Sequence, residues 1–127
     1  MNYETLLFII AVLLTHLTFD FFLQSHWMAS NKSKSDLALG AHVGTYTIGL
    51  ILLTVALGYG KLLVGPAPFF FLVFNSGAHW LTDYVTSRMS SRLFAKQEWH
   101  NFFLVVGTDQ FCHYATLFGS FAVFSQA

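Results

Sequence analysis

The sequence predicts an all-α membrane protein, a bundle of four transmembrane helices in a single domain over residues 1–127. Three observations predict this fold. Hydrophobic residues make up 55% of the chain and charged residues only 9%, whereas roughly a quarter of a soluble domain is charged. Four apolar stretches approach the roughly 17–25 residues that a helix needs to cross a bilayer. Most basic residues lie in two of the three connecting segments, as cytoplasmic loops require.

Each predicted span is an apolar run bounded by polar or glycine-containing segments. The four runs are residues 3–24, 37–57, 69–85 and 102–124. The segments between them are residues 25–36, 58–68 and 86–101. In the last of these, Arg88, Arg92 and Lys96 recur every four residues, which predicts a short interfacial helix between the third and fourth spans.

Basic residues predict the orientation. The first and third connecting segments contain five of them, whereas the second contains only Lys61. By the positive-inside rule both termini face away from the cytoplasm. The formal net charge is zero, so the chain has no basic face for a nucleic acid.

Seven ionisable side chains lie inside the predicted spans, although a central Asp costs roughly 2.5–3.5 kcal/mol on insertion scales. They are His16, Asp20, His42, His79, Asp83, Asp109 and His113. In the first, third and fourth spans a spacing of four residues places both members of a pair on one helix face, and His42 stands alone in the second span. All seven fall in the cytoplasmic half of the bilayer, so they are expected to form one cluster.

Imidazole and carboxylate ligands favour zinc, manganese or iron. The lone Cys112 excludes a cysteine cluster. Three aspartates carry a charge of −3, so the site is expected to hold one or two divalent ions, with two ions and a hydroxide closest to neutral. Gln24 and Gln110 are expected to orient ligands, and Lys32, Arg88 and Arg92 to bind a lipid headgroup. Polar contacts between helices without any bound ion, and a proton or ion path through the same residues, are the alternatives.

A short motif occurs twice. His16 and Asp20 close the first span as His-x-x-x-Asp, and His79 and Asp83 close the third in the same way. Because these helices would run in the same direction, the repeat suggests two parallel helical hairpins related by a pseudo-twofold axis, with duplication and coincidence both open.

The run from His16 to Gln24, with Lys32, His42, the motif at His79 and the final Asp109-Gln110-x-x-His113, resembles the domain of unknown function 3307 family. The resemblance spans nearly the whole chain. It implies a small multi-pass membrane protein of bacteria and their phages, and hence a bacterial inner membrane. The site is similar in type to that of the inner-membrane metal-dependent hydrolases, although the motifs do not align.

The leading functional hypothesis is an intramembrane metal-dependent hydrolase that acts on a lipid-linked ester or phosphoester near the cytoplasmic interface. A bound divalent ion can lower the pKa of water to about 7, and a pair of ions can hold both the attacking and the leaving oxygen. His42 is either a ligand or a proton shuttle, and the catalytic base is left open. The alternatives are a transporter or sensor of metal or protons, acting as a homo-oligomer, and a non-catalytic membrane interaction protein.

Overall fold

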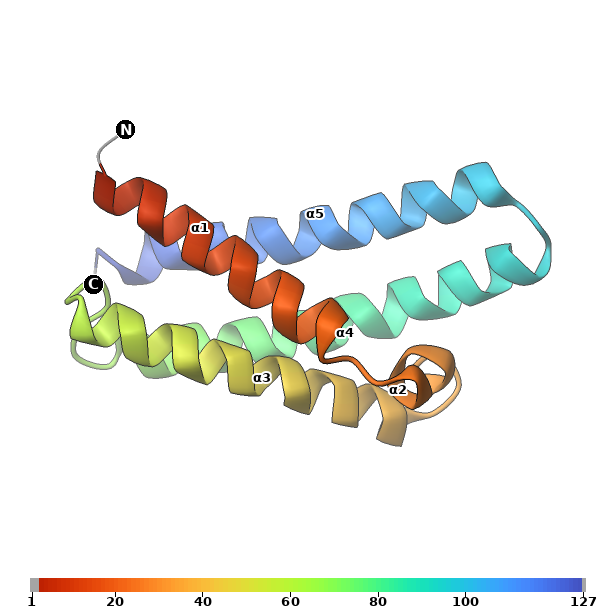
Figure 1. The fold of residues 1–127 in the computed structure, drawn as a ribbon, viewed down its shortest axis with the longest axis horizontal. Coiled ribbons are helices and arrows are strands. Elements are labelled where there is room, and N and C mark those ends of the chain that lie inside the picture. The colour runs from red at the N-terminus through yellow and green to blue at the C-terminus, as the bar shows by residue number, and fades with distance from the viewer. Residues whose placement is uncertain (1–2, 127) are drawn as a thin grey trace.

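The computed structural model describes residues 3–126, which form five α-helices and one π-helix and contain no strand. Figure 1 shows four long helices that run alternately in opposite directions, so that α1 begins and α5 ends at the same end of the bundle. The elements are α1 (Tyr3–Leu17), η1 (Thr18–Phe22), α2 (His26–Asn31), α3 (Asp36–Tyr59), α4 (Ala67–Ala95) and α5 (Trp99–Phe124). The all-α prediction is therefore confirmed.

Among the described helices, two are long and apolar enough to cross a membrane by length and composition. They are the continuous helix Tyr3–Phe22 and α3. At 29 and 26 residues α4 and α5 have the length but carry more polar side chains. Four membrane spans therefore stay a prediction.

The separate interfacial helix predicted within residues 86–101 is wrong. Helix α4 continues without a break to Ala95, and the chain reverses at residues 96–98, where Gln97 has a positive φ of 58°. No glycine or proline interrupts residues 86–95, and the ring of Phe94 packs against Phe102 of α5 at 5.7 Å between centroids. Arg88 and Arg92 therefore lie on the last turns of α4, and Lys96 directly follows its end.

Two local features were not predicted, one in the first connection and one at the end of the first span. Helix α2 forms within the polar segment, where the Ser25 hydroxyl accepts a hydrogen bond from the Met28 backbone N–H at 3.2 Å. The first span also changes to a π-helix after Leu17, and the Leu23 N–H bonds to the Thr18 carbonyl oxygen at 2.9 Å. Such wide turns are frequent at functional sites, and this one contains the buried Asp20.

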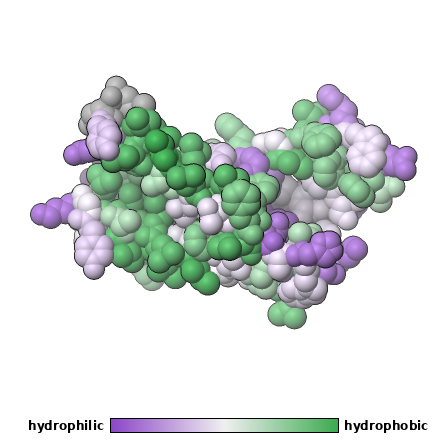
Figure 2. Space-filling view, viewed as in Figure 1, coloured by the Kyte–Doolittle hydropathy of each residue, from purple (hydrophilic) through white to green (hydrophobic). Residues whose placement is uncertain are grey.

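Hydrophobic and polar surfaces occupy different parts of the molecule. Figure 2 shows hydrophobic residues over much of the left half of the view, around α1 and α3, and more hydrophilic residues toward α2 and the α4–α5 turn. Large apolar side chains are exposed on all four long helices, among them Leu14, Leu52, Phe69 and Phe111. Extensive exposed apolar surface of this kind indicates contact with a partner or a membrane.

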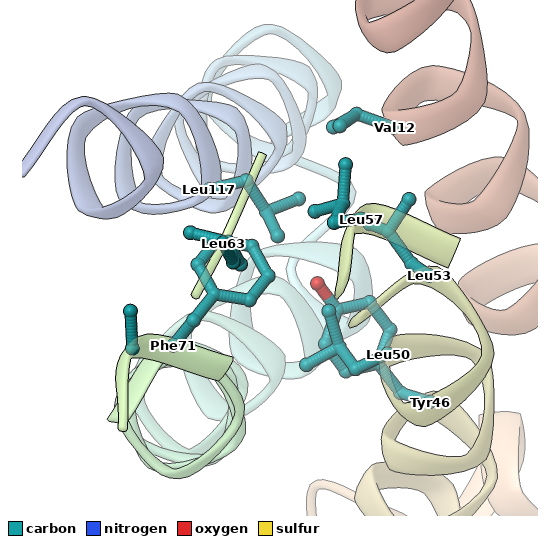
Figure 3. Close-up of a cluster of buried hydrophobic side chains, with 9 residues drawn as sticks. Val12, Tyr46, Leu50, Leu53, Leu57, Leu63, Phe71 and Leu117 are labelled. Atoms are coloured by element: carbon teal, nitrogen blue, oxygen red, sulfur yellow. The ribbon is translucent and has the colours of Figure 1, made fainter. Parts of the chain in front are cut away.

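The hydrophobic core fills the half of the bundle nearest the start of α1. Figure 3 shows side chains from α1, α3, α4 and α5 directed toward one another, with Val12, Leu50, Phe71 and Leu117 among them. Tyr46 lies at the border of this core, because its ring also stacks on His79 at 3.8 Å between centroids. Polar residues therefore occupy the next layer of the bundle.

Gly49 allows α3 to approach η1 closely, because a Cβ atom at this position would overlap the Phe19 ring. We expect Gly49→Ala to destabilise the fold by about 1–3 kcal/mol, as overpacking typically does. Gly44 is the matched control, since a Cβ there meets nothing within 4 Å. Gly44→Ala should be neutral or stabilising by about 0.5–1 kcal/mol. Unfolding in detergent, followed by circular dichroism, measures both, and equal stabilities would refute the close contact.

Candidate metal centre

The structure brings all seven predicted site residues together in the polar layer of the bundle. Each long helix contributes at least one, and η1 contributes Asp20. Six of the side chains are at most 4% exposed, whereas Asp109 is 16% exposed. A buried group of three carboxylates and four imidazoles needs mutual pairing or a bound cation.

A first cluster contains Asp20, His42, His79 and Asp83. The Nε2 atom of His42 lies 3.0 Å from Asp20 Oδ1, 2.9 Å from Asp83 Oδ2 and 3.3 Å from His79 Nε2. His79 Nε2 lies 3.3 Å from Asp20 Oδ1 and 3.9 Å from Asp83 Oδ2. Four ligand atoms from three segments thus meet at one point.

These separations fit a shared ion as well as individual hydrogen bonds, but the number of contacts at one nitrogen favours an ion. Metal–ligand bonds of about 2.0–2.1 Å place tetrahedral ligand atoms ~3.3 Å apart. An imidazole nitrogen has one proton or one lone pair and cannot satisfy three neighbours. Asp20 Oδ1, although close to two imidazoles, accepts no hydrogen bond of good geometry from any described residue. Two nitrogens and two oxygens suit zinc, manganese or iron.

A second cluster contains Asp83, Asp109 and His113. His113 Nε2 lies 3.1 Å from Asp83 Oδ1 and 3.4 Å from Asp109 Oδ2. Asp83 therefore presents Oδ2 to the first cluster and Oδ1 to the second. One carboxylate shared in this way is suited to bridge two ions, and paired ions in enzymes lie about 3.5–4 Å apart.

His16 lies beside these clusters rather than in them. Its Nε2 atom is 3.0 Å from Gln110 Oε1 and 3.5 Å from Asp20 Oδ2. The Gln110 amide donates in turn to Asp109 Oδ2 at 3.0 Å. Gln110 thus connects His16 to Asp109, whereas Gln24 Oε1 is buried without a partner among the described residues.

Lys32 reaches the centre from the segment between α2 and α3. Its ammonium nitrogen lies 2.8 Å from Asp83 Oδ2 and 3.4 Å from His42 Nε2, and its side chain is 21% exposed. A cation therefore already neutralises part of the first cluster. Among the other predicted headgroup residues, Arg88 pairs with Asp36 at 2.9 Å and Arg92 is exposed near the end of α4.

Two supporting residues were not predicted. Tyr46 stacks on His79 and limits the rotation of that imidazole. The Thr86 hydroxyl donates to Asp109 Oδ1. Thr86 lies three residues after Asp83 on α4, so helical spacing places the two on the same face. Only the structure shows that the Thr86 hydroxyl contacts Asp109.

We expect Thr86→Val to weaken metal binding by about 10–100-fold, because hydrogen bonds to ligating carboxylates typically contribute this much to affinity. Thr108→Val is the matched control, since Thr108 precedes Asp109 but is exposed, and its hydroxyl donates to the carbonyl of Leu104 on its own helix. Competition with a chromogenic chelator measures both affinities. Equal affinities in the two variants would exclude a supporting role for Thr86.

A cavity of about 540 Å³ adjoins the centre. Asp20 of the first cluster and Asp109 of the second both line it, together with Lys32. Its other walls come from η1, α2, α4 and α5, on the side of the bundle where Figure 2 shows hydrophilic residues. Its volume falls within the roughly 300–1,000 Å³ that is typical of small-molecule sites. Because Asp20 and Asp109 line it, a ligand there would contact both clusters.

Comparison with known proteins identifies one family. The model of a family described as "Protein of unknown function (DUF3307)" matches residues 8–126, which include all seven predicted site residues. No curated protein matches the chain. No solved structure matches it.

Proposed function

The chain belongs to the DUF3307 family of proteins of unknown function, and we propose that it is an intramembrane metal-dependent hydrolase of a lipid-linked ester or phosphoester. The observation that carries this proposal is the pair of ligand clusters joined by Asp83 and opening onto one cavity. Because the family carries no assigned activity, the proposal rests on the site alone.

We assign two divalent ions to the centre. Asp20, His42, His79 and Asp83 would hold the first ion, and Asp83, Asp109 and His113 the second. Three carboxylates carry a charge of −3, so two divalent ions leave about +1, which one hydroxide would neutralise. Lys32 would then have to leave Asp83, since its ammonium lies within the first set of ligands.

Four membrane spans account for the distribution of polar and apolar side chains. The seven site residues face the interior of the bundle, whereas large apolar side chains on α1, α3, α4 and α5 face outward. Buried ionisable groups and an apolar exterior are what a bilayer requires. The positive-inside rule puts the cavity, which is lined by Lys32 and Lys34, at the cytoplasmic side.

The position of the cavity suits hydrolysis near the membrane interface. When bound, two divalent ions supply an activated water and stabilise the charge that develops on the attacking and leaving oxygens. Asp20 and Asp109 border both the clusters and the cavity, so a reacting ester held there would lie beside the ions. Gln110 and Thr86 keep Asp109 oriented toward His113.

Hydrolysis is tested with metal-loaded protein in detergent or liposomes and a panel of lipid esters and phosphoesters. We expect release of product by the wild type and its loss in Asp109→Asn, with Asp36→Asn as the exposed control. Absence of turnover by the metal-loaded wild type would contradict a hydrolase. Metal flux into liposomes that depends on Asp20 and Asp109 would show that the protein is a transporter and not a hydrolase.

A further inference from the structure

We propose that the cavity beside the metal centre binds a phosphate group carried on a hydrocarbon chain. Lys34 and a group of serine hydroxyls would hold the phosphate, and an aromatic wall would hold the first part of the chain. The inference names the substrate class of the proposed hydrolase, so it rests on the proposed function where hydrolysis of this ligand is concerned. Binding itself requires no turnover.

Lys34 supplies a cation that no carboxylate of residues 3–126 neutralises. Its side chain is exposed at the cavity, and no described carboxylate forms an ion pair with it. Lys32 lies two residues earlier and also lines the cavity, but its ammonium is held by Asp83. A lysine with free hydrogen-bond donors is a common ligand for phosphate.

Serine hydroxyls surround the same space from two sides. Ser30 and Ser33 lie in and after α2, whereas Ser87, Ser90 and Ser91 lie on consecutive turns of α4. The Ser87 hydroxyl is buried and has no hydrogen-bond partner among the described residues. The Ser30 hydroxyl already contacts His26 Nε2 at 3.4 Å. A serine hydroxyl can donate one hydrogen bond, and the oxygens of a phosphate are strong acceptors. The serine-lined part of the cavity therefore suits an oxyanion, whereas Asp20 and Asp109 line the part that belongs to the ligand clusters.

The remaining wall is apolar. Phe21 of η1, Phe94 of α4, and Phe102 and Val106 of α5 line the cavity. Phe94 and Phe102 contact each other edge to face, with 5.7 Å between ring centroids, although Phe94 is 57% exposed. An inorganic phosphate would leave this wall in contact with water, whereas a hydrocarbon chain would cover it. An anionic amphiphile uses both walls of the cavity.

The test is binding of dodecylphosphonate, which has no hydrolysable ester, to the full chain in an uncharged detergent. Native mass spectrometry after treatment with a chelator counts the molecules retained. We expect one retained molecule of dodecylphosphonate per chain. At equal concentration, neither inorganic phosphate nor dodecyltrimethylammonium should displace it. Displacement by inorganic phosphate would make the cavity a free-phosphate site and overturn the proposal, as would displacement by the cationic amphiphile.

Two matched pairs of variants test the two walls. Lys34→Gln should weaken binding about tenfold, the usual loss of one charge-assisted contact, whereas Lys61→Gln in the segment between α3 and α4 should not. Phe102→Ala should weaken binding by a similar factor, whereas Phe103→Ala changes an outward side chain that is 67% exposed. Equal effects within either pair would overturn the assignment.

These measurements separate the two proposals. Retention of dodecylphosphonate by protein that releases no product from any ester would contradict hydrolysis and support this cavity as an anionic-lipid site. Metal-dependent turnover without retention of dodecylphosphonate would overturn the substrate class and leave the hydrolase in place.

Discussion

Replacing Asp83 by asparagine is expected to abolish metal binding at both clusters at once. The two carboxylate oxygens face different clusters, with His42 Nε2 2.9 Å from Oδ2 and His113 Nε2 3.1 Å from Oδ1. Asparagine has nearly the same volume, but it removes the negative charge and one oxygen ligand. The loss of metal affinity should be larger than the loss of about 100-fold that typically follows removal of a supporting residue.

Zinc titration against a chromogenic chelator distinguishes a shared ligand from two independent sites. We expect the wild type to bind two equivalents of zinc and Asp83→Asn to bind none, because Asp83 belongs to both clusters. Asp109→Asn should bind one equivalent, because Asp109 belongs only to the second cluster. Asp36→Asn is the control, since this carboxylate is 74% exposed and pairs with Arg88. One equivalent retained by Asp83→Asn would show that Asp83 does not bridge.

Replacing Lys32 by methionine is expected to destabilise the metal-free protein and to strengthen metal binding. The Lys32 ammonium lies 2.8 Å from Asp83 Oδ2, where it substitutes for a metal cation. Breaking a buried ion pair costs roughly 3–5 kcal/mol, and the 21% exposure of Lys32 lowers this figure. If the substitution lowers the stability of the metal-free state alone by about 1.4 kcal/mol, the metal affinity rises about tenfold.

Unfolding and zinc titration of the same variant measure the two effects. Lys34→Met is the matched control in the same segment, because Lys34 is exposed and forms no ion pair with a described carboxylate. We expect the stability difference to disappear once zinc is added. Weaker zinc binding by Lys32→Met would mean that the lysine supports the metal rather than competes with it.

The convergence of the polar residues follows from spacing that is visible in the sequence. His16 and Asp20, and likewise His79 and Asp83, lie four residues apart, so each pair occupies one helix face. Burial of charge then leaves the interior of the bundle as the only acceptable location. Both copies of the repeated motif meet there, although duplication itself stays a prediction.

Other features depend on contacts that spacing does not describe. The bridging position of Asp83 depends on the rotation of its carboxylate between α3 and α5. Lys32 reaches the centre from a loop, so no helical period indicates it. The spacing of polar residues does not indicate the π-helix at Thr18–Phe22, and α4 continues to Ala95 because no glycine or proline interrupts residues 86–95.

The alternative to a metal centre is a polar interior in which carboxylates and imidazoles satisfy one another. The approach of three polar groups to His42 Nε2 exceeds what one imidazole nitrogen can bond. This crowding favours an ion. The Nδ1 atoms of His16, His42 and His79 are buried without a hydrogen-bond partner among residues 3–126, but they do not distinguish the two interpretations, because the contacts of the clusters are made by the Nε2 atoms.

The metal content of the purified wild-type protein tests this account most directly. Inductively coupled plasma mass spectrometry is applied after mild chelation, re-addition of zinc, manganese or iron, and removal of free ions. We predict two equivalents of divalent metal per chain. Folded protein that retains and rebinds no metal would contradict the metal centre and favour the purely polar interior.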